Sequence, residues 1–565
     1  MNKGITFGLV FMLVIMSFTS ISGIQINTQT IESSGRGDIL YVGGSGPNNY
    51  TTIQSAINNA NNGDTVFVYD DRSPYYECIE IDKSINLIGE NRDTTIIDGS
   101  NIGDVVKVTA NEVNISGFKI TNCKENYYGI RVGRATNHIT ITDNIISQNY
   151  RGIFFRGEYS TVSNNLFVYN SNNGILMNSD YSIIHGNRFT QNGGKGIYLN
   201  DHNYNEITSN FFCSMRSGIW LRCEGGHIEF NQIKNNIIIN TDYAIYMRGN
   251  SRGGQWRCRN NWISENYIAN NNMGIYLTDY TYDNHVDHNN VINNNIQAID
   301  YGYPGNYWDN GSIGNYWSDY TGEDNDGDGI GDTPYNISNG DDKDYYPLME
   351  PWITDELTVV AYGQYYGLIN FPMQFYGLAV GGFKPYSWFW DFGDGNSSDE
   401  QNPSHIYTEA GNYDVVLTVT DNSSNSSGDN TCAWIQAFND PPVKPSIDGE
   451  TSGKAGVSYP YTFETNDPEG LQVWYYIEWG DGSNTGWIGP YDSDEAITES
   501  HSWSIQGNYI IKAKAKDIFD AESDWAEFPI TMPRDKSTNN MLLLSLFERF
   551  PLLQRLLNNW WWNLE

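Results

Sequence analysis

A repeat of about 22 residues runs through residues 129–301 and limits the folds open to this chain more than any other feature. Its first element is Gly or Ala, then Ile, any residue, and an apolar or aromatic residue, at steps of 23, 22, 22, 22, 26, 30 and 24 residues. The repeats start at Gly129, Gly152, Gly174, Gly196, Gly218, Ala244, Gly274 and Ala298. Strands this short cannot bury a face alone, so the repeats must stack and bury their alternating apolar residues together. Small residues before each Ile are expected to permit a tight corner.

The second element of the repeat is Ile or Val followed three residues later by Asn. The Asn residues are Asn144, Asn165, Asn187, Asn210, Asn236, Asn266 and Asn289. Amides at the same place in every coil can hydrogen-bond to one another as a ladder. The pattern predicts an all-β fold in which coils of three short strands stack, as in a right-handed parallel β-helix. A leucine-rich horseshoe would need a Leu-x-x-Leu-x-Leu signature, which is absent.

The two ends of the repeat region carry recognisable segments. Residues 50–60 predict an amphipathic helix with Ile53, Ala56, Ile57 and Ala60 on one face, which would close the open end of the apolar stack. Residues 38–349 resemble the NosD-like, pectate-lyase-like β-helix proteins of archaeal and bacterial surfaces. The resemblance rests on Tyr-Thr-Thr-Ile-Gln-Ser-Ala-Ile from Tyr50, Ser-Ile-Asn-Leu-Ile-Gly-Glu from Ser84, and Gly-Asn-Tyr-Trp-Ser-Asp-Tyr from Gly314. We assign 38–302 to the β-helix and 303–350 to a C-terminal cap.

An Asp-rich loop lies within the cap. Its Asp residues stand at positions 1, 3, 5 and 9, with Gly at position 6 and Ile at position 7, and the candidate ligand residues are Asp324, Asp326, Asp328, Ile330 and Asp332. Alternating carboxylates converge where Gly allows a sharp turn, and hard oxygen ligands suit Ca²⁺. Position 12 is Tyr335 instead of the Glu of an EF-hand. We expect a structural calcium loop; a solvated acidic turn is the alternative.

Two further segments predict β-sandwiches. Residues 355–438 contain Trp-Asp-Phe-Gly-Asp-Gly from Trp390 and a cleanly alternating strand from Tyr413, and they resemble a polycystic-kidney-disease (PKD) domain, an immunoglobulin-like sandwich. Residues 441–533 repeat the theme with Trp-Gly-Asp-Gly from Trp479, after a Pro-Pro linker. We interpret Asp391, Asp394 and Asp481 as turn residues, because Asp-Gly favours turns.

The two ends of the chain indicate export. Residues 1–23 have a cationic start, an apolar stretch and small residues at the usual cleavage spacing, as in a signal peptide, with a retained anchor as the alternative. Residues 534–565 form an amphipathic, Trp-rich tail that suits an interfacial, docking or sorting segment. We therefore expect a secreted or cell-surface protein. Its six Cys permit disulfides, with free, buried Cys as the alternative, and the sequence leaves their pairing and the oligomeric state open.

Two columns of residues are candidates for ligand binding. The outward residue of each first element gives an aromatic column, made of Arg131, Phe154, Leu176, Tyr198, Trp220, Tyr246, Tyr276 and Asp300. Two positions further on, a polar column holds Arg156, Asn178, Asn200, Arg222 and Arg248. Exposed rings beside Arg and Asn can stack on sugars and bind their hydroxyls or carboxylates, so a polysaccharide or surface glycan is the expected partner. A ladder that only stabilises coil stacking is the alternative.

Composition and missing motifs restrict the function. With 68 Asp+Glu, 32 Lys+Arg and a net charge of -36, the chain is not expected to bind nucleic acid, and a membrane contact is expected only through the tail. We find no catalytic residues: Asp242 is interpreted as a loop residue without an acid partner. The eight scattered His do not predict the copper site that a NosD resemblance implies. We expect a non-enzymatic, glycan-binding or adhesive protein; a polysaccharide lyase or hydrolase acting on acidic glycans and a structural envelope component are the alternatives.

Overall fold

The computed structural model describes residues 37–250, 257–302, 305–339, 341–354, 356–363 and 365–532. The predicted signal peptide and C-terminal tail lie outside these residues. The chain divides into two units, Met1–Trp352 and Ile353–Glu565. Within the described residues, no helix is long and apolar enough to cross a membrane.

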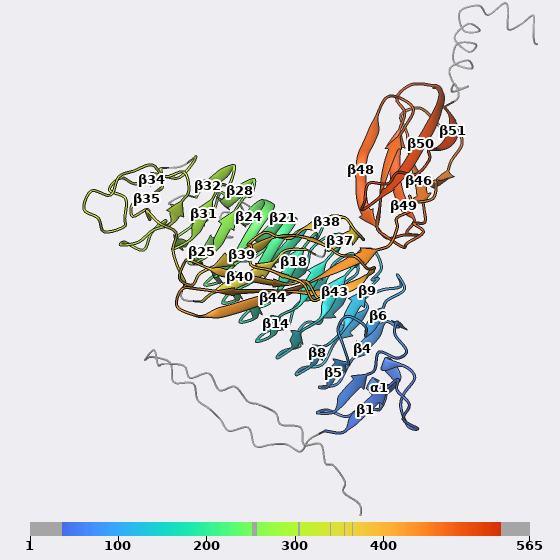
Figure 1. Cartoon of the computed structure of the whole chain (residues 1–565), viewed down its shortest axis with the longest axis horizontal. Helices are drawn as coiled ribbons and strands as arrows, with labels where there is room; N and C mark the ends of the chain where they lie inside the picture. Colours follow the sequence, from blue (N-terminus) through green and yellow to red (C-terminus); the bar gives the residue numbers. More distant parts are fainter. Residues whose placement is uncertain are drawn as a thin grey trace, which may run out of the picture. The chain divides into compact units, whose positions relative to one another are not determined.

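The first unit is a parallel β-helix, as predicted. Its strands follow one another in chain order along the stack (Figure 1). The first stack is a sheet of β1 (Ile39–Val42), β2 (Thr65–Val68), β5 (Asn86–Gly89), β8 (Asn114–Ser116), β11 (Thr140–Thr142), β14 (Thr161–Ser163), β17 (Ile183–His185), β20 (Glu206–Thr208), β23 (Gln232–Lys234), β26 (Trp262–Ser264) and β30 (His285–Asp287). A small sheet of β22 (Ile228–Glu229), β25 (Cys258–Arg259) and β29 (Thr281–Tyr282) lies at one corner.

Two more stacks of strands complete each coil. One holds β3 (Tyr75–Tyr76), β6 (Ile96–Asp98), β9 (Lys119–Thr121), β12 (Ile145–Ser147), β15 (Leu166–Val168), β18 (Arg188–Thr190), β27 (Tyr267–Ala269), β31 (Asn290–Ile292) and β33 (Tyr316–Trp317). The other holds β4 (Ile79–Ile81), β7 (Val106–Val108), β10 (Ile130–Val132), β13 (Ile153–Phe155), β16 (Ile175–Met177), β19 (Lys195–Asn200), β28 (Met273–Leu277) and β32 (Ile296–Asp300). The 12-residue strands β21 (Phe211–Arg222) and β24 (Ile237–Arg248) belong to both stacks and join them into one sheet.

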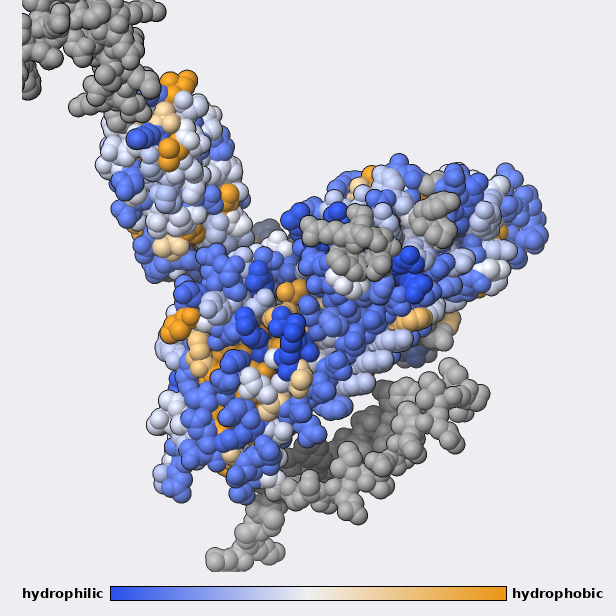
Figure 2. Space-filling model, turned by 180° about the vertical axis from the view of Figure 1, so that it is seen from behind, coloured by the Kyte–Doolittle hydropathy of each residue, from blue (hydrophilic) through white to orange (hydrophobic). Residues whose placement is uncertain are grey.

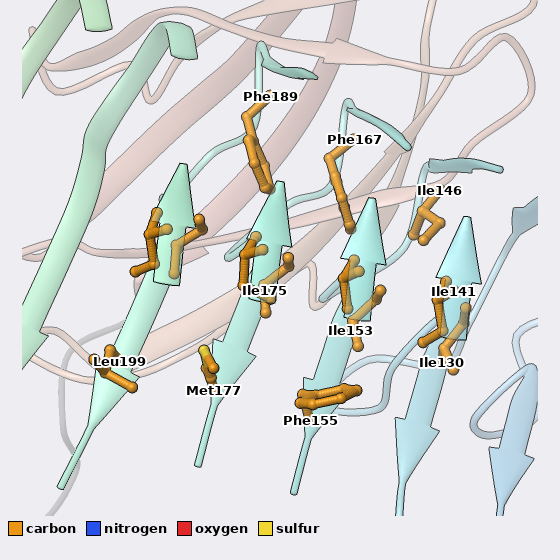
Figure 3. Close-up of a cluster of buried hydrophobic side chains, with 14 of the residues drawn as sticks. Ile130, Ile141, Ile146, Ile153, Phe155, Phe167, Ile175, Met177, Phe189 and Leu199 are labelled. Carbon is orange, nitrogen blue, oxygen red and sulfur yellow. The ribbon is translucent and has the colours of Figure 1, made fainter. Parts of the chain in front are cut away.

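Apolar side chains fill the interior in vertical columns. Phe167 stands next to Phe189, with ring centroids 4.6 Å apart, and Ile153 next to Ile175 on neighbouring strands (Figure 3). Strand β10 buries its first and third side chains and β11 only the middle one, as period-2 alternation predicts, whereas β12 and β13 bury all three. The core is therefore continuous from coil to coil, which is what lets such short strands persist.

Amide ladders stabilise the corners, and there are more of them than the repeat predicts. The predicted ladder runs from Asn144 to Asn289 and continues to Asn315; each side-chain amide donates to the next Asn Oδ1 at about 3 Å. A second ladder includes Asn149, Asn170 and Asn192, and a third runs from Asn205 to Asn306. All are buried, so each amide also satisfies backbone groups that no water reaches.

The small residue before each Ile has a different role from the one expected. The tight corners lie just before the ladder Asn, where Asp143 and Asn164 adopt φ of 54° and 56°. A Cβ at Gly196 would instead stand 2.5 Å from the Phe212 ring, and one at Gly152 would stand 2.4 Å from Gly174 O. Gly is thus required there for close packing between coils and not for turning the chain.

Both ends of the solenoid are closed. At the start, α1 (Ile53–Asn59) buries the predicted apolar face, and Lys83 Nζ donates to three carbonyls at its C-terminal end. At the other end, β34 (Tyr335–Asn336) and β35 (Lys343–Asp344) form a hairpin. Here the buried Asp344 carboxylate accepts from Trp317 Nε1 at 2.8 Å and Asn315 N at 2.7 Å. Burial raises the pKa of Asp344 to about 6, although these hydrogen bonds act in the opposite direction.

The second unit contains two sandwich modules with separate cores. The first has β36 (Thr358–Ala361), β37 (Tyr365–Leu368), β38 (Pro372–Gln374), β39 (Gly377–Val380), β40 (Ser387–Asp391), β41 (Ser397–Ser398), β42 (Ser404–Ile406), β43 (Gly411–Thr420) and β44 (Ser426–Gln436). The second has β45 (Ser446–Gly449), β46 (Ser458–Glu464), β47 (Val473–Glu478), β48 (Asn484–Tyr491), β49 (Ile497–Ser502), β50 (Gly507–Asp517) and β51 (Ala526–Met532).

The Asp-Gly motifs of both modules have the same local structure. His405 Nε2 lies 2.8 Å from Asp394 Oδ2, and His501 Nε2 lies 2.8 Å from Asp481 Oδ2. The same carboxylates accept backbone N–H groups within their own turns. These aspartates therefore act in turns, as interpreted, and the shared His–Asp pair relates the two modules.

Candidate functional site

The predicted columns lie in register on the stack that contains β10, β13, β16 and β19. Pairing runs from Arg131 to Phe154, then Leu176, Tyr198, Trp220, Tyr246 and Tyr276. In the polar column, Asn200 pairs with Arg222 and Arg222 with Arg248. We call these two columns, without Asp300, the column face.

The last member of the aromatic column was predicted wrongly. Tyr276 pairs with Ile299, and Asp300 pairs with Leu277, so the final coil is shifted by one residue. A shift of one residue turns a side chain from one face of a strand to the other. Asp300 is consequently buried, where its carboxylate accepts from Trp308 Nε1 at 2.9 Å.

The aromatic rings of the column face pack on each other more than expected. The rings of Trp220 and Tyr246 are 3.7 Å apart between centroids, and those of Tyr246 and Tyr276 are 5.2 Å apart. Phe154 and Tyr246 are only 8% and 7% exposed, so the expectation of exposed rings is wrong for these two. Neighbouring strands lie about 4.8 Å apart, which leaves room for stacked rings but none for a sugar between them. Tyr198, Trp220 and Tyr276 are half-buried and remain accessible.

Two residues beside the column face were missed. Lys195 and Tyr243 stand in a neighbouring column, since Lys195 pairs with Ser217 and Ser217 with Tyr243. The Tyr243 ring lies 6.0 Å from Trp220 and 5.9 Å from Tyr276. Inspection of the residue just before each Gly-Ile or Ala-Ile pair would have found this column for some coils, because Lys195 immediately precedes Gly196.

Cations and rings are interleaved in the centre of the face. Lys195 Nζ lies 4.8 Å from the Trp220 ring centroid and 5.1 Å from that of Tyr198, within cation–π range. Burial and the neighbouring Arg216 and Arg222 lower the pKa of Lys195, because like charges disfavour another positive charge. One acidic group counters them: Glu224 is 3.2 Å from Arg222 Nη1 and accepts from Tyr198 Oη at 3.0 Å.

A second group of cations lies nearer the start of the solenoid. Arg156 lies 4.3 Å from the Phe154 ring centroid, and burial together with Arg134 and Arg131 lowers its pKa. Arg131 Nε is 2.8 Å from Asp104, so one of these three charges is neutralised. Positive charge thus accumulates at two points along one face of a chain with net charge -36.

Three polar atoms on the face have no hydrogen-bond partner. These are Trp220 Nε1, Asn178 Oδ1 and Asn200 Oδ1, each covered by neighbouring atoms. An unpaired buried polar atom costs free energy, so a ligand that displaced the covering side chains would recover part of that cost.

A longer aromatic ladder at another corner is structural. Tyr159, Tyr181 and Tyr204 stack with centroids 5.1 and 4.9 Å apart and nearly parallel planes, and a parallel stack of Trp262 on His285 follows at 5.5 Å. The stacked faces cover each other, although Tyr159, Tyr181 and Tyr204 remain 51%, 45% and 46% exposed. No cation–π contact to these rings is found among the described residues. This ladder therefore serves as an internal comparison for the column face.

The Asp-rich loop brings together three of the predicted calcium ligands. Carboxylate oxygens of Asp324, Asp326 and Asp328 lie within 4.8 Å of one another. Asp332 points elsewhere and accepts from Asn325 Nδ2 at 2.7 Å, while Ile330 N donates to Asp328 Oδ1 at 2.8 Å. Asp326 accepts a hydrogen bond from Asp328 N, which lowers its pKa, but the charge of Asp328, desolvation and the hydrogen bond with Asp324 together outweigh this and the pKa is raised.

No pair of acids was predicted for catalysis, and Asp242 is solvent-exposed in the structure. It lies inside strand β24 and not in a loop, because β24 runs unbroken through the corner that separates two strands in other coils. Burial and the Glu224 hydrogen bond raise the pKa of Tyr198, which disfavours its use as a general base.

Residues 57–258 and 228–322 match the family described as periplasmic copper-binding protein (NosD), and residues 374–434 match the PKD domain. The solenoid is thus similar to the NosD family, and a PKD domain follows it. Collagenase ColA of Bacillus cereus is 32% identical over 167 residues, which cover 26% of this chain and 17% of the collagenase. The chain spans less than a fifth of the length of the curated relatives it matches first.

Solved structures with similarity to parts of the NosD-like chain include a PKD domain of an M14-like peptidase from Thermoplasmatales archaeon SCGC AB-540-F20. It is 50% identical, with a TM-score of 0.17, and 17% of this chain covers 100% of it. The alginate lyase of Paenibacillus sp. str. FPU-7 is 15% identical with a TM-score of 0.33, over 48% of this chain and 97% of the lyase. Neither similarity is strong enough to transfer an activity.

The copper named in the family description does not fit the described residues. Among them, the group of three or more His, Cys, Asp or Glu side chains that converges is the acidic one at Asp324, Asp326 and Asp328. Hard carboxylates suit Ca²⁺ better than copper, which favours imidazole and thiolate ligands. His285 stacks on Trp262 and Tyr307, while His288 lies beside Asp287 and Trp352. These histidines serve in packing.

Proposed function

We propose that the NosD-like solenoid binds an acidic polysaccharide along the column face without cleaving it. The observation that carries this proposal is the concentration of Lys195, Arg222 and Arg248 around half-buried rings in a strongly acidic chain. The side of the molecule seen in Figure 2 is largely hydrophilic, with scattered apolar patches. Uronate carboxylates would pair with the cations, and sugar rings would rest against the exposed edges of Tyr198, Trp220 and Tyr276.

The spacing of the face suits a chain-like ligand. Successive positions of a column rise by about 4.8 Å per coil, so a polysaccharide lying along the solenoid would meet several coils at once. Each contact can be weak, since contacts along one ligand add as multivalent binding does. The sandwich modules would act as spacers or adhesive units, and the signal-like start supports a position at the cell surface or outside the cell.

The test compares binding of the full chain to uronate-containing and neutral polysaccharides by affinity electrophoresis. We expect Arg222→Ala and Trp220→Ala to weaken retention by the acidic polymer at least about tenfold, and binding to fall steeply with salt. Trp262→Ala and Arg92→Ala are matched controls, because Trp262 belongs to the other ladder and Arg92 is exposed far from the face in sequence.

The same samples distinguish the alternatives. Unsaturated products or new reducing ends that disappear in Arg222→Ala would make the protein a lyase or hydrolase. Retention unchanged by all four substitutions, or no retention at all, would refute a role of the column face and favour a structural envelope component.

We further propose that the Asp-rich loop binds Ca²⁺ as a structural ion. Three carboxylates crowd together at Asp324, Asp326 and Asp328, and a divalent cation would remove their mutual repulsion. The loop lies between β33 and β34, so the ion would stabilise the cap of the solenoid.

A further inference from the structure

Two cysteines from different coils meet in the solenoid core. Cys223 follows the last residue of β21, and Cys258 begins β25. Both are 0% exposed, and their Sγ atoms are 2.9 Å apart although 35 positions separate them in the sequence. Among the described contacts, Cys78, Cys123 and Cys213 have no sulfur partner within hydrogen-bonding distance.

The backbone around the pair holds the two sulfurs together. Cys223 N donates to Arg248 O at 2.9 Å, and Cys258 Sγ lies 3.3 Å from the same oxygen. Cys258 pairs with Ile228 in the parallel corner sheet. Closing the two sulfurs to a bond length of about 2.05 Å needs a shift of about 1 Å, which small side-chain rotations supply.

A metal ion does not explain this contact. Two thiolates on one tetrahedral zinc, with Zn–S of about 2.3 Å, would be about 3.8 Å apart, which is farther than the observed separation. No third His, Cys, Asp or Glu converges on the pair among the described residues. Burial also raises the pKa of Cys258, and a metal site would need thiolates.

We propose that Cys223 and Cys258 form a disulfide in the exported protein. The thiolate of one cysteine attacks an external disulfide, such as oxidised glutathione, and expels one thiol; the second cysteine then attacks the mixed disulfide and expels the other. The protein loses two protons and two electrons, and the external disulfide takes them up and is reduced to two thiols. Because both thiols are fully buried once the coils have stacked, the exchange takes place before this part of the solenoid closes.

The position of the bond gives it a role. Cys223 directly follows Arg222 of the column face, and Cys258 lies within the longest repeat step, 30 residues from Ala244 to Gly274. A longer repeat step is the place where a solenoid opens locally most easily. The cross-link fastens the coils on either side and thereby holds the ends of β21 and β24 in place.

The test uses the full chain refolded with oxidised and reduced glutathione, then denatured and alkylated without further reductant. We expect four alkylated cysteines and a linked peptide pair that contains Cys223 and Cys258. In Cys223→Ser, Cys258 should become alkylated, whereas Cys213→Ser, another buried cysteine, should leave the linked pair intact. Six alkylated cysteines in the unsubstituted chain, or a linked pair of other cysteines, would overturn the proposal.

A second measurement covers a variant that fails to fold. Dithiothreitol should lower the temperature at which the first thermal transition occurs in the unsubstituted chain and in Cys213→Ser. The transition of Cys223→Ser/Cys258→Ser should not respond. Equal responses in all three proteins would refute the cross-link independently of the alkylation result.

Discussion

The buried amide ladders can be tested with two adjacent asparagines that differ in almost nothing except burial. Asn271 is buried and its Nδ2 donates to Asn294 Oδ1 of the next coil at 2.9 Å, whereas Asn272 is exposed. Asn271 Oδ1 accepts from Thr241 N at 2.9 Å, and its Nδ2 donates to Ile238 O at 3.0 Å. Asn272 Oδ1 accepts only from the exposed Asn295 at 3.2 Å.

The expected magnitude follows from the groups that Asn271→Ala leaves without a partner. Thr241 N and Ile238 O would both lose the side-chain partner described above. An orphaned buried polar group costs about 1–3 kcal/mol, so two cost about 2–6 kcal/mol. Asn272→Ala breaks no buried hydrogen bond and should change the free energy of unfolding by less than about 0.5 kcal/mol. Because both variants replace Asn by Ala at adjacent positions, residue type and local sequence cannot explain a difference in stability between them.

Hydrogen exchange followed by mass spectrometry suits this test, because the solenoid and the sandwiches need not unfold together. Peptides from β24 and β27 should exchange at least about 30-fold faster in Asn271→Ala, since 1.4 kcal/mol corresponds to a factor of about ten. Peptides from the sandwich cores serve as an internal reference and should not change. Equal exchange in Asn271→Ala and Asn272→Ala would refute the argument that the buried ladder stabilises the coils.

Two further predictions concern the cap. Millimolar Ca²⁺ should raise the melting temperature of the first thermal transition, and EDTA should lower it, in the unsubstituted chain and in the control Asp399→Asn. Neither should change the melting temperature of Asp326→Asn. A melting temperature of the unsubstituted chain that EDTA does not change would contradict the calcium loop. The pKa of Asp344, raised to about 6, means that the folded state binds a proton more tightly than the unfolded state, so the Asp344 contribution to stability should fall as pH rises from about 4 to about 6 and then level off. Urea unfolding at several pH values should show that the free energy of unfolding depends less on pH in Asp344→Asn than in the unsubstituted chain. An unchanged pH dependence would assign the effect to other groups.

The solenoid could be predicted because its information is local and repeated. The ladder Asn and the alternating Ile, Val and Leu occupy the same place in each coil, so one period is enough to specify parallel stacking. The helix at the start is equally local, with its apolar face of Ile53, Ala56 and Ile57. The PKD domain could be predicted for the same reason, because its motif is one short, continuous stretch of sequence.

Register and packing had to come from the structure. The shift that buries Asp300 depends on how β32 pairs with β28, which a spacing of 24 residues does not reveal. The burial of Phe154 and Tyr246 depends on ring contacts between coils, and the role of Gly196 depends on Phe212 from the next coil.

The sequence by itself determined the architecture: a stack of coils with amide ladders, an Asp-rich cap and two sandwiches. It also identified the column face, because alternation decides which side of a strand each residue takes. Only the tertiary structure decided which rings of that face stay accessible, that Lys195 and Tyr243 join them, and that Cys223 meets Cys258. The physical reason is that periodicity sets the direction of a side chain, whereas contacts between coils depend on insertions and register shifts that alter the stacking.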